Sequence, residues 1–119
     1  MATAFFVTNP PALKTQSSVK DLKTRLDWGE PALTILDVRD RSAFNLEHIQ
    51  GAISMPLATL VASAQQTLEQ ERDIYVYGDS EATTAEAANQ LRASGYQQVA
   101  ELIGGLADWK AAQFPVEGL

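Results

Sequence analysis

Short apolar runs alternate along the chain with segments of helical periodicity, and this alternation restricts the fold more than any other feature. Four runs rich in β-branched and aromatic residues are bounded by glycine, proline or polar residues; they lie at positions 33–38, 52–55, 74–77 and 99–103. Such short, continuously apolar runs are typical of strands buried on both faces of a parallel sheet. Neighbouring parallel strands need a crossover connection, which is usually a helix. The sequence therefore predicts an α/β fold with a mostly parallel central sheet of four or five strands and helices on both faces.

Helices are expected in the segments between these strands. Ser18, followed by Asp21, resembles a capped helix start, and the apolar residues after it repeat at helical spacing as far as Gly29. Further helical segments are expected at residues 41–47, 57–68, 84–94 and 104–109. Residues 78–83 are predicted to form a polar loop and residues 1–12 an N-terminal arm, with an additional strand near Leu13. The 119 residues fit a single domain, 1–119.

The net charge of −6 disfavours two classes of partner. Non-specific nucleic-acid binding needs clustered lysines and arginines, and anionic membrane surfaces also attract basic proteins. No apolar run approaches the ~20 residues of a membrane-spanning helix, and the apolar start lacks the charged residues of a secretory signal. We therefore expect no nucleic-acid partner, no membrane partner and a cytoplasmic location.

The sequence contains no cysteine, which limits the chemistry that is available to it. Disulfides, thiolate nucleophiles and thiolate metal sites are all excluded. His48 is the single histidine, so no second imidazole can share a metal ion with it. We expect no metal ion and no cofactor.

Five motifs occur in the order and spacing found in the rhodanese homology domain. Residues 36–39 read LDVR, residues 48–53 read HIQGAI where the family has HIPGAI, and residues 102–109 resemble its LxGGxxxW signature. Residues 74–77 resemble the strand that precedes the family's active-site loop, and residues 85–95 the alanine-rich helix that follows it. This resemblance runs from about residue 13 to residue 116. It implies a rhodanese-like fold and, in active members, transfer of a sulfane sulfur by a cysteine thiolate.

The chain departs from the family pattern at the active-site loop, which reads C-x-x-G-x-R in active members. The six matching residues are Gly78, Asp79, Ser80, Glu81, Ala82 and Thr83. Gly78 stands at the cysteine position, Glu81 at the glycine position and Thr83 at the arginine position. The resemblance therefore identifies a degenerate active-site loop with no catalytic residue, and it predicts that the chain is not an enzyme.

Compared with the family pattern, the loop of this chain differs in its charge as well as in its nucleophile. Gly78 has no side chain to carry sulfur, and Ser80 is a nearby hydroxyl that would need an adjacent base to act as a nucleophile. The sequence places two carboxylates, Asp79 and Glu81, near a helix N-terminus, where the helix dipole stabilises negative charge. They either cap the helix and face water or form an acidic surface that recognises a basic partner. A cation site is disfavoured, because two carboxylates are a thin coordination set.

Other polar residues are expected to support the loop. Asp37 and Arg39 either line a pocket at the strand end or, as the resemblance implies, fix the loop through hydrogen bonds and an ion pair. His48 is expected to anchor a loop. Tyr75 and Tyr77 share one face of a strand and are expected under a helix, with their hydroxyls near the surface. Trp109 is expected in the core.

The leading hypothesis is a catalytically inactive rhodanese-like domain that acts as a binding or regulatory module. Its unknown protein partner would bind through the surface of residues 78–83 and would present a basic surface there. One alternative is a protein associated with sulfur transfer that needs a partner-supplied cysteine. Another is a structural or oligomerisation domain. Fold alone does not distinguish these functions.

Overall fold

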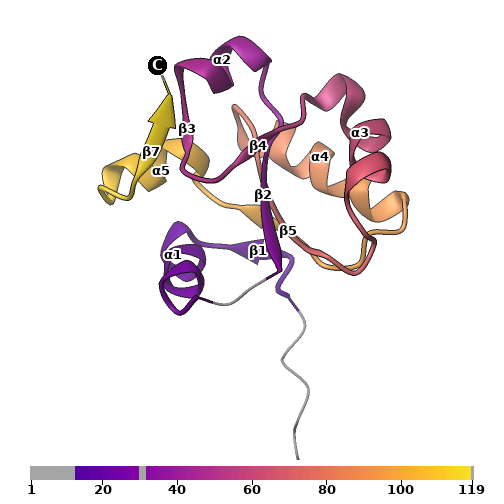
Figure 1. The fold of residues 1–119 in the computed structure, drawn as a ribbon, viewed down its shortest axis with the longest axis horizontal. Helices are drawn as coiled ribbons and strands as arrows, with labels where there is room; N and C mark the ends of the chain where they lie inside the picture. The colour runs from indigo at the N-terminus through magenta and orange to yellow at the C-terminus, as the bar shows by residue number, and fades with distance from the viewer. Residues whose placement is uncertain (1–12, 30–31, 119) are drawn as a thin grey trace, which may run out of the picture.

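A five-stranded parallel sheet forms the centre of the computed structural model, which describes residues 13–29 and 32–118 (Figure 1). In spatial order, the strands are β1 (Gln16–Ser17), β6 (Val99–Leu102), β5 (Asp73–Tyr77), β2 (Leu33–Asp37) and β4 (Ile53–Ser54). All neighbouring pairs are parallel, so the prediction of a mostly parallel sheet is confirmed. The additional strand begins three residues after Leu13. The predicted N-terminal arm, residues 1–12, lies outside the described residues.

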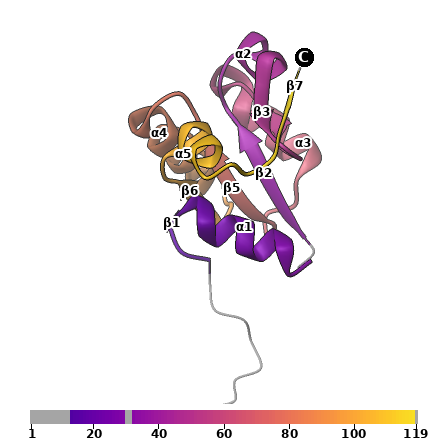
Figure 2. The same ribbon diagram turned by 90° about the vertical axis from the view of Figure 1, so that its left-hand side faces the viewer.

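Helices cover both faces of this sheet, as predicted. One face carries α1 (Val19–Asp27) and α5 (Gly105–Ala111), and Figure 2 views the molecule from that side. The other face carries α3 (Leu60–Thr67) and α4 (Glu81–Ala93), which lie together on the right of Figure 1. The segment expected as one helix at 57–68 is divided into a short 3-10 turn, η2 (Leu57–Thr59), and α3.

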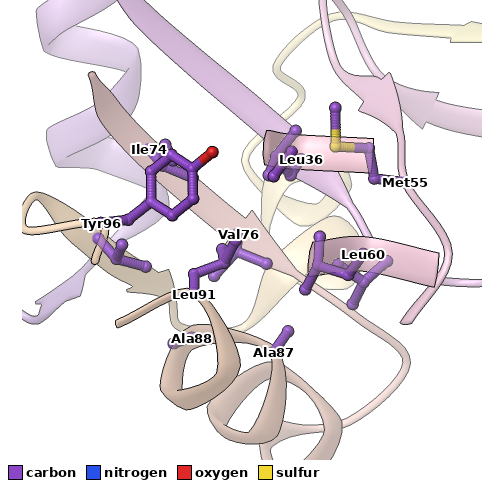
Figure 3. Packing of buried hydrophobic residues seen from close by; sticks show 12 residues of the cluster. Leu36, Met55, Leu60, Ile74, Val76, Ala87, Ala88, Leu91 and Tyr96 are labelled. Atoms are coloured by element: carbon purple, nitrogen blue, oxygen red, sulfur yellow. The ribbon is translucent and has the colours of Figure 1, made fainter. Parts of the chain in front are cut away.

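The core consists of two apolar clusters separated by the sheet. Because successive strand residues point to opposite faces, Leu36 and Val76 pack toward α3 and α4, whereas Ile35 and Tyr75 pack toward α1 and α5. Figure 3 shows the first cluster, in which small and branched side chains of α4 lie against strand residues. The second cluster contains Trp109, which is 1% exposed, so the prediction that it lies in the core is confirmed.

Helix α4 begins earlier than predicted, which shortens the loop before it. The loop comprises residues 78–80, and residues 81–83 form the first helical turn, so the predicted loop of 78–83 is three residues too long. The reason is that Ser80 has extended backbone and its Oγ accepts a hydrogen bond from the Thr83 N–H at 3.1 Å. A serine in this position satisfies one of the free N–H groups at a helix start.

A second, two-stranded sheet was not predicted. The segment at 41–47 forms α2 (Arg41–Leu46) and then β3 (Glu47–Ile49), which pairs antiparallel with β7 (Val116–Gly118). The end of the described chain therefore lies beside α2 and β3 (Figure 1). Within residues 13–29 and 32–118, no helix is long and apolar enough to cross a membrane.

Candidate functional site

The candidate site lies where the parallel strands β2, β5 and β6 end. Parallel strands share a direction, so the loops that follow them gather at one edge of the sheet. These loops are residues 38–40, 78–80 and 103–104. The polar loop predicted from the sequence therefore lies beside the end of β2, which ends at Asp37 and is followed two residues later by Arg39.

Gly78 follows β5 directly and is held in a close-packed position. Its N–H donates a hydrogen bond to the buried Thr84 hydroxyl at 2.9 Å. A Cβ atom added to Gly78 would lie 3.0 Å from Thr83 Cγ2 and 3.1 Å from Val38 Cγ2, which is closer than ordinary van der Waals contact. The position that matches the family's cysteine thus has no side chain and little room for one.

The hydroxyls near Gly78 are engaged with each other. Ser80 Oγ accepts from the Thr83 N–H and also lies 3.1 Å from Thr83 Oγ1. Ser80 therefore caps α4. Ala82, the remaining small residue of the segment, is exposed in the first helical turn. The single histidine does not serve Ser80 as a base, because both ring nitrogens of His48 lie against Phe44 and Glu117.

Glu81 connects the starts of α4 and α5. Its Oε2 accepts a hydrogen bond from the Gly104 N–H at 3.0 Å. Gly104 has a φ of 81°, a conformation that glycine adopts at little cost, and a Cβ atom there would collide with the carboxylate of Asp108. Two carboxylates therefore converge on Gly104, one from each helix.

Asp79, Glu81 and Asp108 are exposed at this edge of the sheet, and we refer to them as the acidic rim. Asp79 also acts on the neighbouring Arg39. The hydrogen bonds from Arg39 to Asp37 are the main cause that raises the pKa of Arg39 above its usual value, and the charge of Asp79 adds to the effect.

Asp37 and Arg39 form the predicted ion pair. Asp37 is fully buried, and its carboxylate accepts hydrogen bonds from the Arg39 N–H at 3.0 Å, from Nε at 3.0 Å and from a terminal guanidinium nitrogen at 2.7 Å. The same terminal nitrogen donates to the Glu47 carbonyl at 2.6 Å. Arg39 therefore satisfies a buried carboxylate and ties the end of β2 to β3.

Tyr77 belongs to this support and was placed wrongly by sequence reasoning. It does share one face of β5 with Tyr75, but it is 0% exposed, and its hydroxyl accepts a hydrogen bond from the Ile49 N–H at 3.1 Å. Burial, together with the nearby Asp37 carboxylate, raises the pKa of Tyr77 well above its usual value. The alternation of residues along the strand indicated the face on which Tyr77 lies. It did not indicate the hydrogen-bond partner, because Ile49 lies 28 residues away in the sequence.

His48 lies in β3, where its side chain contacts α2 on one side and β7 on the other. Its Nδ1 lies 2.7 Å from the Phe44 carbonyl, its ring stacks on the Phe44 ring at 3.7 Å, and its Nε2 lies 3.4 Å from a Glu117 oxygen. Glu117 was not identified from the sequence. No spacing rule connects two residues 69 positions apart.

The chemistry of the described residues is that of a carboxylate surface over a buried ion pair. No group of three or more His, Asp or Glu side chains in the described ranges could hold a metal ion. The sequence offers no thiolate to carry sulfur. The acidic rim presents negative charge at the edge where β2, β5 and β6 end.

Comparison with known proteins identifies the family. The family model for the Rhodanese-like domain matches residues 18–112. The chain is similar to the crystal structure of the Alr3790 protein from Anabaena sp., with 55% sequence identity and a TM-score of 0.85; the match covers 87% of this chain and 92% of that chain. It is also 32% identical to the thiosulfate sulfurtransferase GlpE of Coxiella burnetii over 79 residues, or 66% of this chain and 73% of that protein.

Longer relatives match over part of their length. The putative sulfur carrier protein YrkF of Bacillus subtilis is 29% identical over 92 residues, which cover 77% of this chain and 49% of YrkF. The chain likewise spans about half the length of the Synechocystis protein slr1261, of which it covers 48%. Since the family model matches most of the chain and the parallel sheet agrees with solved relatives, the chain belongs to the rhodanese-like domain family.

Proposed function

We propose that the chain is a rhodanese-like domain without sulfurtransferase activity that binds a protein partner through the edge of the sheet at residues 78–83. The observation that carries this proposal is the replacement of the family's nucleophile by Gly78 in a close-packed position, next to exposed carboxylates. The partner would present basic side chains to this edge.

The lack of activity is supported by the side chains around Gly78. A rhodanese reaction needs a thiolate that accepts a sulfane sulfur, and no residue of the sequence supplies a thiol. Ser80 is a poor substitute, because its hydroxyl caps α4 and no base lies beside it among its described contacts. The Glu81 carboxylate would also repel an anionic sulfur donor.

Binding of a basic partner is supported by the charges that stay accessible. Asp79 is exposed, and within residues 13–29 and 32–118 its carboxylate accepts no hydrogen bond from a backbone N–H, whereas Glu81 accepts one from Gly104. Asp108 adds a second exposed carboxylate from α5. An acidic patch on a protein of net charge −6 attracts basic surfaces over long range and speeds their association.

A second candidate is a part in sulfur transfer in which a partner supplies the cysteine. The names of two relatives favour it, since one is a thiosulfate sulfurtransferase and the other a putative sulfur carrier protein. In this case the partner would bring its cysteine to the same edge of the sheet. A structural or oligomerisation role is a third candidate, and it requires no contact at residues 78–83.

The experiment is affinity capture of partners from native lysate, followed by binding measurements with the captured protein. We would compare wild type with Asp79→Lys and with Glu71→Lys. Glu71 is a matched control, because it is exposed two residues before β5 whereas Asp79 is exposed two residues after it. The two variants change the net charge equally at opposite ends of one strand.

We expect Asp79→Lys to weaken binding clearly and Glu71→Lys to change it little. Binding should also weaken as salt is added, because exposed charges are screened over ~8–10 Å at moderate ionic strength. Equal binding by all three proteins, or binding that does not depend on salt, would rule out the acidic edge as the binding surface. A partner that brings an essential cysteine would support the second candidate.

A further inference from the structure

His48 and Glu117 face each other across the small antiparallel sheet. They are cross-strand partners in β3 and β7, and His48 Nε2 lies 3.4 Å from Glu117 Oε1. The same carboxylate oxygen accepts a hydrogen bond from the Gly51 N–H at 3.2 Å. The His48 side chain is 12% exposed and that of Glu117 is 49% exposed, so the pair lies at the boundary with solvent.

The position of the His48 proton follows from its second contact. Nδ1 lies 2.7 Å from the Phe44 carbonyl, and a carbonyl oxygen can only accept, so Nδ1 carries a hydrogen. Nε2 is therefore the nitrogen that gains or loses a proton. With the proton, Nε2 is a cationic donor facing a carboxylate; without it, a lone pair faces the negative oxygen.

The described elements α2, β3 and α5 carry four other charged side chains, which are Arg41, Glu47, Asp108 and Lys110. Arg41 of α2 lies over the Phe44 ring at 5.6 Å, and Glu47 of β3 pairs with Lys110 of α5 at 2.6 Å. Asp108, also on α5, lies over Gly104 at the start of that helix. Among these groups, the Glu117 carboxylate is the one in contact with His48 Nε2.

Few other hydrogen bonds hold the strand β7 within residues 13–29 and 32–118. All three of its residues are exposed, and it pairs with β3 over three positions. Just before it, the Pro115 carbonyl accepts hydrogen bonds from the Gln50 N–H at 3.2 Å and from Trp109 Nε1 at 2.7 Å. Loss of one side-chain contact therefore removes a large share of the interactions that hold residues 116–118 on β3.

We propose that His48 and Glu117 form a pH-responsive clasp that holds β7 on β3 when His48 is protonated and loosens it when the proton leaves. The strand also forms one wall of an open hollow lined by Leu46, Glu47, Val116, Glu117 and Gly118. Release of β7 would change the shape of that surface. The proton comes from and returns to solvent, and no other reactant is involved.

The test is hydrogen exchange of the backbone amides of residues 116–118 by NMR, at about pH 5.5 and pH 8 and corrected for intrinsic exchange rates. We expect these amides to be roughly two- to fivefold better protected at the lower pH, the range of an exposed ion pair. In Glu117→Gln the pH difference should vanish. Glu47→Gln is the matched control, because it removes the neighbouring carboxylate and should leave the difference in place.

The single histidine gives a second readout that does not depend on exchange. At about pH 5.5 the chemical shifts of the His48 ring signals should differ between wild type and Glu117→Gln, and they should stay nearly unchanged in Glu47→Gln. Equal protection of residues 116–118 at both pH values in wild type would overturn the proposal. A pH difference that persists in Glu117→Gln would overturn it as well.

Discussion

Replacing Trp109 with alanine should destabilise the protein strongly, because this ring is the largest fully buried side chain. Removal of a buried tryptophan typically costs about 3–5 kcal/mol, through lost transfer free energy and the cavity that remains. Two specific contacts place the expected cost in the upper part of that range. The ring meets Phe114 edge-on at 5.0 Å, and Nε1 donates to the Pro115 carbonyl at 2.7 Å.

The assay is urea denaturation of each variant followed by far-UV circular dichroism, since the mutation removes one of only two tryptophans and alters fluorescence. Trp28→Ala is the matched control: this side chain is 80% exposed at the end of α1, so its removal should change the free energy of unfolding by less than about 0.5 kcal/mol. Trp109→Phe should fall between the two. A cost for Trp109→Ala below about 1.5 kcal/mol, or one no larger than that of Trp28→Ala, would refute the placement of α5 on the sheet.

Three further changes test the edge of the sheet. Arg39→Ala leaves the buried Asp37 without its ion-pair partner, so urea denaturation should show a loss of about 3–5 kcal/mol. Because burial raises the pKa of Tyr77, the folded protein keeps a proton that the unfolded chain releases; stability should fall as the pH rises above about 10, and less steeply in Tyr77→Phe. In Glu81→Ala the Gly104 amide should exchange faster with deuterium by NMR than in wild type or Glu81→Gln. A much smaller loss of unfolding free energy in Arg39→Ala would contradict the ion pair. A fall of stability above pH ~10 that is equally steep in Tyr77→Phe and wild type would contradict the burial of the Tyr77 hydroxyl. An unchanged exchange rate of the Gly104 amide in Glu81→Ala would contradict the hydrogen bond between them.

The parallel sheet could be predicted because its signals are local. Continuously apolar runs predicted β2, β5 and β6, and all three lie within a residue or so of the expected positions. Ser18 predicted the start of α1, and its Oγ does accept a hydrogen bond from the Asp21 N–H at 3.0 Å. Each of these features depends on residues that are close together in the sequence.

The parts that escaped prediction depend on contacts between distant residues or on competing local rules. The β3–β7 pair joins segments about 69 residues apart, and two strands of three residues, of which only Ile49 is buried, are too short to show a clear alternation. The start of α4 differs from the prediction because residues 81–83 continue the polar segment that was predicted to be a loop. The capping preference of Ser80 determined the boundary instead.

The sequence predicted several residues of the candidate site but few of the contacts between them. Asp37 and Arg39 were expected to pair, and they do. The hydrogen bond from the Gly104 N–H to Glu81 could not be read from the sequence, because it needs the starts of α4 and α5 to be adjacent in space. Asp108 was missed for the same reason, and the hydroxyl of Tyr77 was placed near the surface because its partner, the Ile49 N–H, is distant in the sequence.

The most direct test of the central claim is the transfer of sulfur from thiosulfate to cyanide, measured as thiocyanate formation with the purified wild-type chain. We predict no thiocyanate above the protein-free background, because Gly78 stands where a thiolate is needed. The triple variant Gly78→Cys, Glu81→Gly and Thr83→Arg tests the assay on the same fold. It introduces a thiol, removes a carboxylate and replaces the threonine whose methyl group crowds position 78. The variant should therefore accept sulfur, which mass spectrometry would detect as added mass. Thiocyanate formation by wild type in proportion to protein concentration would contradict the account.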